Sequence, residues 1–229
     1  MRFSKMTNSL PQFNDPSLLE RALTHRSALN EPGSGTSSNK SNERLEFLGD
    51  AVLELITTQF LFDKFPQEPE GVLTSYRSAL VRTTTLGQVA QELNLGEKLY
   101  MSKGEEATGG RTNPSLLADT MEAVIGALYL DQGLSATQEF ISDLIFPKID
   151  QIQEQKLYKD PKSWLQELVQ AEGYSTPRYR LVKAVGPDHQ KIFTIEVMID
   201  DQVWGTGQGS NKQAAQQEAA AEAIDRFQK

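Results

Sequence analysis

The stretch NERLEFLGD, residues Asn42–Asp50, places three carboxylates among apolar side chains. At about 100° per residue, Glu43, Glu46 and Asp50 lie on one stripe of a helix. Apolar residues recur at helical intervals on the other side: Leu45, Leu48, Val52, Leu55 and Ile56. The pattern predicts an amphipathic helix that runs to about Phe65, where Pro66 ends it.

Two explanations fit the acidic stripe. Like charges at these intervals repel by a few tenths of a kcal/mol per pair, so helix stability does not account for them. A solvated acidic face is the commoner explanation in an arbitrary chain. A cleft that holds a cation is the alternative, and it requires a second source of ligands.

The stretch LLADTMEAVIGA supplies a second acidic pair, Asp119 and Glu122, again three residues apart and again beside apolar residues. Half-buried carboxylates are costly unless a cation compensates them. Two packed helices could therefore gather four or five carboxylates around hard divalent ions. An all-oxygen set without His or Cys suits Mg²⁺ or Mn²⁺ rather than zinc, and such ions polarise phosphodiesters and activate water.

Composition limits the class of protein. The 229 residues are 38% hydrophobic, enough for one large or two small domains. The absence of cysteine excludes disulfides and thiolate metal sites, and favours a reducing compartment. No basic leader opens the sequence, and the apolar run AVIGALYL is shorter than the ~20 residues of a membrane span. We therefore expect a soluble cytoplasmic protein without membrane contact. The net charge of −8 argues weakly against a nucleic-acid partner.

Helical periodicity dominates residues 11–150. Asp15 and Pro16 form an N-cap and first-turn pair, and the polar loop NEPGSGTSSNKSN leads into the acidic helix. We predict two further helices in GVLTSYRSALVRTTTLGQVAQELNL, a loop in GEEATGGRTNPS and a deep helix in SLLADTMEAVIGALYLDQG. Residues 135–155 predict one more helix, with an interruption at Pro147.

The pattern changes near Lys156. A second Asp-Pro pair at residues 160–161 starts a short helix that ends at Gly173. Alternating apolar residues predict two strands, QVWGTGQG predicts a third, and an alanine-rich helix from about Lys212 ends the unit. The alternating residues are Tyr179, Leu181 and Val185 on the first strand, and Phe193, Ile195, Val197 and Ile199 on the second. We predict a separate α-β-β-β-α unit.

NERLEFLGD resembles the signature of the ribonuclease III family, and the resemblance covers nearly the whole chain. ALTHRS precedes it, FPQEPEGVLTSYRSALV and LLADTMEAVIGALYLD follow it, and the C-terminal region is similar to a double-stranded-RNA-binding domain. The order is that of the short bacterial type. The resemblance implies an all-α endonuclease domain at residues 1–155, a linker at 156–160 and an α+β RNA-binding domain at 161–229.

Carried over by position, the family's metal ligands fall on Glu46, Asp50, Asp119 and Glu122. The resemblance puts Asp50 and Glu122 nearest the chemistry, and Glu43 and Glu70 around the cleft and the bound RNA backbone. It implies Mg²⁺, with Mn²⁺ as a substitute. It also implies a homodimer that pairs near the signature helices and cuts double-stranded RNA, leaving 5′-phosphate and 3′-hydroxyl ends with short 3′ overhangs. Its tasks would be rRNA and mRNA processing.

Several residues near these motifs have more than one explanation. Glu54 lies on the acidic stripe but matches no metal position, so we expect a solvated or interface role. His25 in LTHRS could be a general acid, although metal-activated water needs no imidazole and a structural role is favoured. Arg77 and Arg82 either contact phosphate or pair with acids.

Domains of the C-terminal kind read the shape of about 16 base pairs through 2′-hydroxyls and phosphates. The resemblance offers Gln166 and Glu167 to one minor groove and the loop around His189 to the next. Lys212, at the N-terminus of the last helix, would meet phosphates. Asn211 and Ala215 stand where basic or other polar residues are common.

The net charge of the C-terminal region supports an alternative to RNA binding and catalysis. Residues 160–229 contain eight Lys and Arg against ten Asp and Glu, a net charge of −2 that suits an anion poorly. The domain could be degenerate and kept for protein contacts, and the whole chain could be a non-catalytic RNA-binding or ribosome-assembly protein. The four acids at the metal positions favour the enzyme, because a non-catalytic relative is expected to lose at least one.

Overall fold

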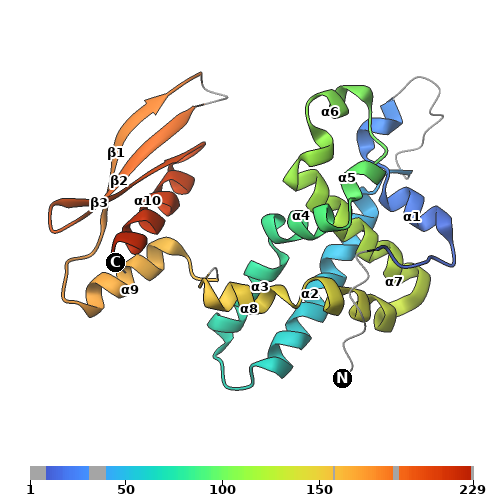
Figure 1. Cartoon of the computed structure of the whole chain (residues 1–229), viewed down its shortest axis with the longest axis horizontal. Helices are drawn as coiled ribbons and strands as arrows, with labels where there is room; N and C mark the ends of the chain where they lie inside the picture. Colours follow the sequence, from blue (N-terminus) through green and yellow to red (C-terminus); the bar gives the residue numbers. More distant parts are fainter. Residues whose placement is uncertain (1–8, 31–39, 157, 188–190, 228–229) are drawn as a thin grey trace. The chain divides into compact units, whose positions relative to one another are not determined.

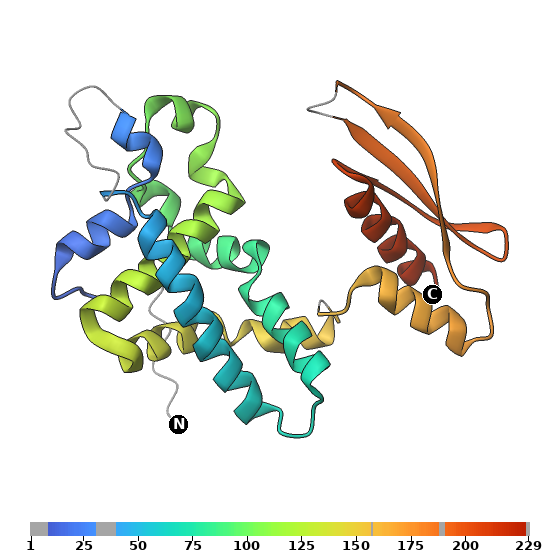
Figure 2. The same cartoon turned by 180° about the vertical axis from the view of Figure 1, so that it is seen from behind.

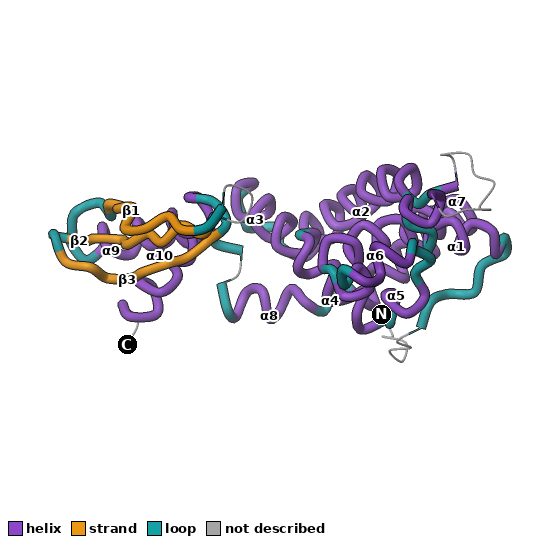
Figure 3. The backbone as a smooth tube through the Cα atoms, turned by 90° about the horizontal axis from the view of Figure 1, so that it is seen from above, coloured by secondary structure: helices purple, strands orange, loops and turns teal. Residues whose placement is uncertain are grey.

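The computed structural model describes residues 9–30, 40–156, 158–187 and 191–227. The chain divides into two compact units, Met1–Tyr158 and Lys159–Lys229 (Figure 1). The three strands of the described chain all belong to the second unit, whereas the first is built from helices (Figure 3). The predicted fold class, all-α followed by α-β-β-β-α, is confirmed. That residues 156–160 act as a linker stays a prediction.

The first unit consists of eight α-helices and two short 3-10 helices within the described ranges. They are α1 (Pro16–Ala22), η1 (Arg26–Asn30), α2 (Glu43–Lys64), α3 (Glu70–Val81), α4 (Thr83–Glu92), α5 (Leu95–Lys98), α6 (Lys103–Ala107), η3 (Gly110–Thr112), α7 (Pro114–Leu144) and α8 (Lys148–Glu154). Helix α2 packs along α7 at the centre of the unit (Figure 2). Leu53 of α2 and Met121 and Ile125 of α7 are fully buried there.

Local sequence signals set several helix ends as expected. The Asp15 carboxylate accepts a hydrogen bond from the Ser17 amide at 3.0 Å and begins α1, with Pro16 in the first turn. Helix α2 ends at Lys64, just before Phe65 and the proline that follows it.

The structure confirms the predicted helix boundary near Gly133 and corrects one predicted loop. Helix α7 spans Pro114–Leu144, but its backbone is non-helical at Gly133, with φ of 80°, so two helical segments meet where the predicted deep helix ends. The predicted interruption at Pro147 is confirmed, because α8 begins directly after it. The predicted loop at residues 104–115 contains most of α6 and all of η3. Its overlooked signal is a capping sequence: the Ser102 hydroxyl accepts from the Glu105 amide at 3.2 Å.

The second unit consists of α9 (Pro161–Ala171), β1 (Arg178–Val185), β2 (Ile192–Ile199), β3 (Gln202–Gly209) and α10 (Lys212–Phe227). The strands form an antiparallel sheet in the order β1-β2-β3, and both helices cover the same face of it (Figure 1). The alanine face of α10 is buried as predicted, at Ala215, Ala219 and Ala223. Helix α10 can lie close to β3 because Gly207 has no side chain. A Cβ at Gly207 would come within 2.2 Å of the Ala219 nitrogen.

Strand β1 departs from simple alternation. Its register against β2 shifts between Leu181 and Lys183, which is a bulge. Leu181 and Val185 are about half exposed, at 46% and 51%. The β1–β2 connection includes His189, which lies outside the described residues.

No helix in the described parts of the chain is both long and apolar enough to cross a membrane.

Candidate active site

Two glycines bring the acidic helices into backbone contact. A Cβ on Gly49 of α2 would lie 1.8 Å from the carbonyl oxygen of Glu122 on α7. A Cβ on Gly126 of α7 would lie 2.2 Å from the carbonyl oxygen of Leu45 on α2. Because neither helix carries a side chain at the crossing, acids that flank it on α2 come close to acids on α7.

The carboxylates that flank this crossing interact electrostatically. Burial raises the pKa of Glu122 to about 8, and the negative charges of Asp50 and Glu46 add to this effect. Burial, followed by the charge of Asp119, raises the pKa of Glu46. Burial also raises the pKa of Asp119, against a smaller opposing effect of His25. The four acids that the sequence predicts as ligands are therefore close enough around the crossing to influence one another electrostatically.

The donor set suits a hard divalent cation. The charges that raise the pKa of Glu122 come from acids, whereas Arg26 and His25 offset part of the negative charge at Glu46 and Asp119. Within the described residues, no three His, Asp or Glu side chains already converge as a preformed metal site. Half-buried carboxylates that repel one another are costly, and a divalent ion would remove that cost. Carboxylate oxygens are also the ligands that Mg²⁺ and Mn²⁺ prefer.

The two additional acids differ in position. Glu43 begins α2, accepts from the Ser41 hydroxyl at 2.9 Å and lies 3.6 Å from the Arg26 guanidinium, while its charge raises the pKa of Glu46. Glu70 begins α3 and accepts from the Thr74 hydroxyl at 3.0 Å. It lines a separate hollow of about 430 Å³ between α2 and α3. Glu43 thus borders the four carboxylates, whereas no contact connects Glu70 to them in the described part of this chain.

The ambiguous residues near the site have structural partners. Arg77 lies 2.8 Å from a carboxylate oxygen of Glu54 and donates to the Thr58 hydroxyl at 2.9 Å. Arg77 therefore pairs with an acid. The ring Nδ1 of His25 lies 2.8 Å from the Ser27 hydroxyl, and the His25 amide donates to the carbonyl of Tyr100 at 2.9 Å. These contacts fit the structural role favoured for His25.

A second surface of α2 is apolar and exposed. Phe47, Leu55 and Phe62 are 81%, 59% and 69% exposed, and their spacing of eight and seven residues puts them on one stripe. Leu55 belongs to the predicted apolar face, yet it lies outside the core of this chain. We call these three residues the α2 stripe; it runs beside the carboxylates.

The predicted RNA-contact residues of the second unit lie on its two helices. Gln166 lines a hollow between α9 and α10, and Glu167 lies 3.3 Å from the Lys159 ammonium. Lys212 is the exposed first residue of α10. Asn211, at a position where a basic residue is common, caps that helix by accepting from the Ala214 amide at 2.9 Å.

Residue-by-residue reasoning from the sequence missed Gly49 and Gly126. A signal for them exists, since an isolated glycine inside an apolar helical pattern commonly marks a close packing contact. Each lies within four residues of a predicted ligand.

Comparisons with known proteins agree over both units. A family model described as Ribonuclease-III-like matches residues 15–149, and one described as Double-stranded RNA binding motif matches residues 161–226. The chain is 49% identical to Ribonuclease 3 of Enterococcus faecalis, covering 93% of this chain and 91% of that protein. It is 47% identical to Ribonuclease 3 of Roseiflexus sp. strain RS-1, covering 93% and 90%.

Solved structures support the same conclusion. The crystal structure of the nuclease domain of ribonuclease III from Campylobacter jejuni matches with a TM-score of 0.54 and 42% identity, over 60% of this chain and 88% of that one. A second structure of that domain, described for flexibility in a region involved in dimer formation, matches with a TM-score of 0.53. The chain therefore belongs to the ribonuclease III family of endoribonucleases, with a double-stranded RNA binding motif after its nuclease domain.

Proposed function

We propose that the protein is a Mg²⁺-dependent endoribonuclease that cuts double-stranded RNA and processes structured precursors such as rRNA and mRNA. The observation that carries this proposal is the meeting of acids from α2 and α7 across the Gly49–Glu122 contact. The products would carry 5′-phosphate and 3′-hydroxyl ends with short 3′ overhangs. The absence of cysteine fits a cytoplasmic location.

The proposed metal ligands are Glu46, Asp50, Asp119 and Glu122, with Mn²⁺ able to replace Mg²⁺. A divalent ion supplies positive charge to the phosphodiester and lowers the pKa of a water molecule. Burial and its acidic neighbours raise the pKa of Glu122 to about 8, so it holds a proton near neutral pH until a cation displaces it. Asp50 approaches from the facing helix. Glu43 and Glu70 are proposed to line the path of the RNA backbone.

We propose that the protein is a homodimer paired through the α2 stripe. Exposed aromatic and aliphatic side chains in one row are unusual on a monomer and typical of an interface. Two-fold pairing is the commonest way to cover such a patch, and it would place two carboxylate sites in one assembly. Each site would then cut one strand of a duplex.

The second unit is proposed to anchor duplex RNA through Gln166, Glu167, His189 and Lys212. Its net charge of −2 means that hydrogen bonds to groove atoms carry more of the binding than charge does. The N-terminus of α10 adds free amides and a favourable dipole for a phosphate. We expect modest affinity.

The decisive experiment incubates the full chain with a long RNA duplex in Mg²⁺, in Mn²⁺ and in EDTA. We expect cleavage in both metals and none in EDTA, with products that a 5′-phosphate-dependent ligase accepts. A non-catalytic RNA-binding or ribosome-assembly protein would bind the duplex and leave it intact in all three buffers. That result would refute the enzymatic assignment.

A further inference from the structure

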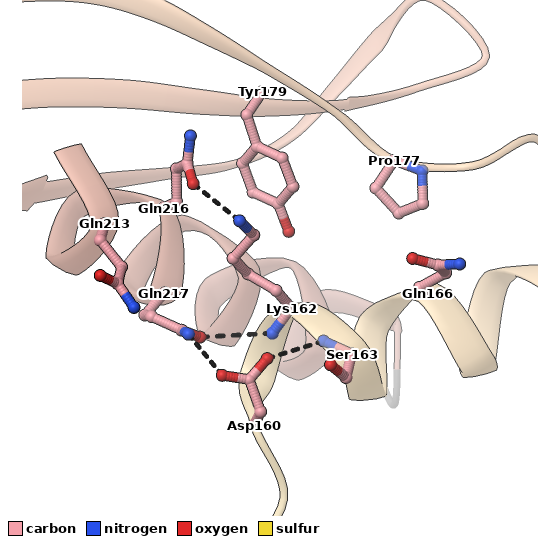
Figure 4. A pocket seen from close by; sticks show the side chains of 9 residues that line it. All are labelled: Asp160, Lys162, Ser163, Gln166, Pro177, Tyr179, Gln213, Gln216 and Gln217. Atoms are coloured by element: carbon pink, nitrogen blue, oxygen red, sulfur yellow. Dashed lines mark hydrogen bonds between the residues drawn. The ribbon is translucent and has the colours of Figure 1, made fainter.

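A polar hollow of about 520 Å³ lies between the first turns of α9 and α10 in the second unit (Figure 4). Two glutamines of α10, Gln216 and Gln217, form hydrogen bonds across it to the start of α9. Both helices carry residues that we propose to contact RNA, and these residues are far apart in the sequence. The two glutamines therefore connect separate parts of one proposed RNA surface.

Gln217 uses both ends of its side-chain amide on the first turn of α9. Its nitrogen donates to the Asp160 carboxylate, and its oxygen accepts from the Lys162 main-chain amide at 3.4 Å. The same carboxylate begins α9 by accepting from the Ser163 amide at 3.0 Å. Although burial opposes the change, hydrogen bonds from Ser163 and Gln217 lower the pKa of Asp160, so it stays ionised. This arrangement needs one donor and one acceptor, which an amide supplies and a carboxylate does not.

Gln216 holds the side chain of the same lysine. Its amide oxygen accepts from the Lys162 ammonium at 2.7 Å, and that ammonium lies 5.0 Å from the centre of the Tyr179 ring. On α9, Gln166 follows Lys162 by four residues, which is about one helical turn. On α10, Gln216 follows Lys212 by the same interval. The bond between Lys162 and Gln216 thus lies one turn from each of two proposed RNA contacts.

Apolar packing between the helices fixes their separation less sharply than these bonds do. The buried face of α10 consists of small side chains near the hollow, at Ala215 and Ala219. Apolar contacts have no preferred direction, whereas a hydrogen bond weakens steeply when its donor and acceptor are misaligned. The two glutamines therefore specify how far Gln166 lies from Lys212.

We propose that Gln216 and Gln217 are positioning residues that fix the spacing of the α9 and α10 contacts to match the grooves of an A-form duplex. A-form RNA and B-form DNA present grooves of different width and depth to the same pair of contacts. The net charge of −2 over residues 160–229 gives little attraction for any duplex, so a preference for RNA depends on this spacing. The inference rests on the proposed RNA-binding function and adds two residues that act without touching RNA.

The first test compares the full-length parent with Gln217→Glu in Ca²⁺ without Mg²⁺. Each is bound to a labelled RNA duplex of roughly 20 base pairs, longer than the ~16 that such domains span, and to a DNA duplex of the same sequence. The variant keeps the size of the side chain, loses the donor and places a second carboxylate opposite Asp160. We expect the ratio of RNA affinity to DNA affinity to fall by about 3- to 10-fold, the typical net effect of one misplaced hydrogen bond.

Gln208→Glu is the charge-matched control. Gln208 is exposed on β3, and its neighbour Gly207 is the residue that faces α10. The substitution adds the same negative charge without touching the hollow, so the affinity ratio should stay at the parent value. An equal fall in both variants would show that charge rather than spacing sets the ratio, and would overturn the inference.

Asp160→Asn combined with Gln217→Glu restores the connection with donor and acceptor exchanged. Asparagine caps a helix about as well as aspartate does. Its amide can donate to the new carboxylate, which also accepts from the Lys162 main-chain amide in place of the glutamine oxygen. The double variant has the net charge of the parent, and its affinity ratio should return most of the way to the parent value. A ratio no better than that of Gln217→Glu would contradict the positioning role.

Gln216→Lys provides a second test that does not depend on the folding of Gln217→Glu. It places a positive charge opposite the Lys162 ammonium, one turn from Lys212. Added charge alone would strengthen binding to both duplexes, whereas loss of the bond to Lys162 should lower the ratio of RNA affinity to DNA affinity. An unchanged or raised ratio would overturn the inference. If the parent binds neither duplex, the proposed function fails; if it binds RNA and DNA equally, this inference alone fails.

Discussion

Glu122, a proposed metal ligand, combines partial burial with close acidic neighbours. Burial and the charges of Asp50, Glu46 and Asp119 together raise its pKa to about 8. The substitution Glu122→Gln keeps its size and removes its charge. We expect cleavage of duplex RNA to fall by several orders of magnitude and the Mg²⁺ requirement to rise. Duplex binding, measured by gel shift in Ca²⁺, should survive or tighten.

Glu54→Gln is the matched control for that variant. Glu54 lies on the same helix, but its carboxylate pairs with Arg77 at 2.8 Å. We expect Glu54→Gln to cleave at nearly the parent rate. Parent-level cleavage by Glu122→Gln at limiting Mg²⁺, or a dead Glu54→Gln, would show that the ligands are assigned wrongly.

The raised pKa of Glu122 also predicts how stability depends on pH in EDTA. The folded protein holds this proton up to about pH 8, whereas the unfolded chain releases it near the ordinary value of 4.5. The free energy of unfolding should therefore fall as pH rises through this window. Glu122→Gln should flatten part of the fall, so its unfolding midpoint should exceed that of the parent at pH 9 and not at pH 4. A midpoint of the parent that rises from pH 5 to 8 would contradict the buried-acid description.

At the scale of helices, the separation of the two acidic pairs depends on Gly49. An alanine there meets the backbone of Glu122, so α2 and α7 must move apart. We expect Gly49→Ala to destabilise the protein by about 1–3 kcal/mol, as overpacked cores do, and to abolish cleavage. Urea unfolding and the duplex assay measure both effects.

Gly71→Ala provides the contrast, because nothing lies within 4 Å of its Cβ position on α3. In a helix, the exchange should stabilise by about 0.5–1 kcal/mol. Similar destabilisation by both variants would contradict a specific role for the contact between α2 and α7, because helix propensity favours alanine at both positions.

Elements with a strong local signal were predictable from the sequence. The Asp-Pro starts at residues 15–16 and 160–161 and the period of α2 each depend on neighbours within a turn or two. The break at Gly133 was predictable as well, because a glycine after an apolar helical run commonly ends a helix. The bulge in β1 was missed because a register shift depends on the partner strand.

The sequence also predicted some features of the candidate site and not others. The acids Glu46 and Asp50 share a helix face that periodicity alone defines. Their proximity to Glu122 follows from the pairing of two distant helices, which residue spacing suggested only as a possibility.

At the scale of the whole molecule, the α2 stripe predicts self-association. We expect sedimentation to show a dimer without RNA at micromolar concentration, and Phe47→Ser to shift it toward monomer. Tyr100→Ser is the control, because Tyr100 is an exposed aromatic residue outside α2, at 59%. A parent protein that stays monomeric would remove the proposal of two clefts acting on one duplex.

Removing residues 156–229 should separate affinity from chemistry. We expect the truncated chain to bind duplex RNA more weakly yet to retain slow, metal-dependent cleavage at low salt. Each phosphate contact contributes roughly 0.7–0.9 to the slope of log affinity against log salt, so the truncated chain should show a shallower slope. Unchanged affinity and slope would mean that the second unit is not the RNA anchor.

The glycine crossing also limits which genetic changes can repair one another. A Cβ added at Gly49 meets main-chain atoms of Glu122 and Gly126, and one added at Gly126 meets main-chain atoms of Leu45 and Gly49. In an ordinary core, a larger residue can be rescued by a smaller one opposite. Here the obstacle is the chain itself, which no substitution makes smaller. A selection for suppressors of Gly49→Ala should therefore return the original glycine rather than second-site exchanges across the helix pair.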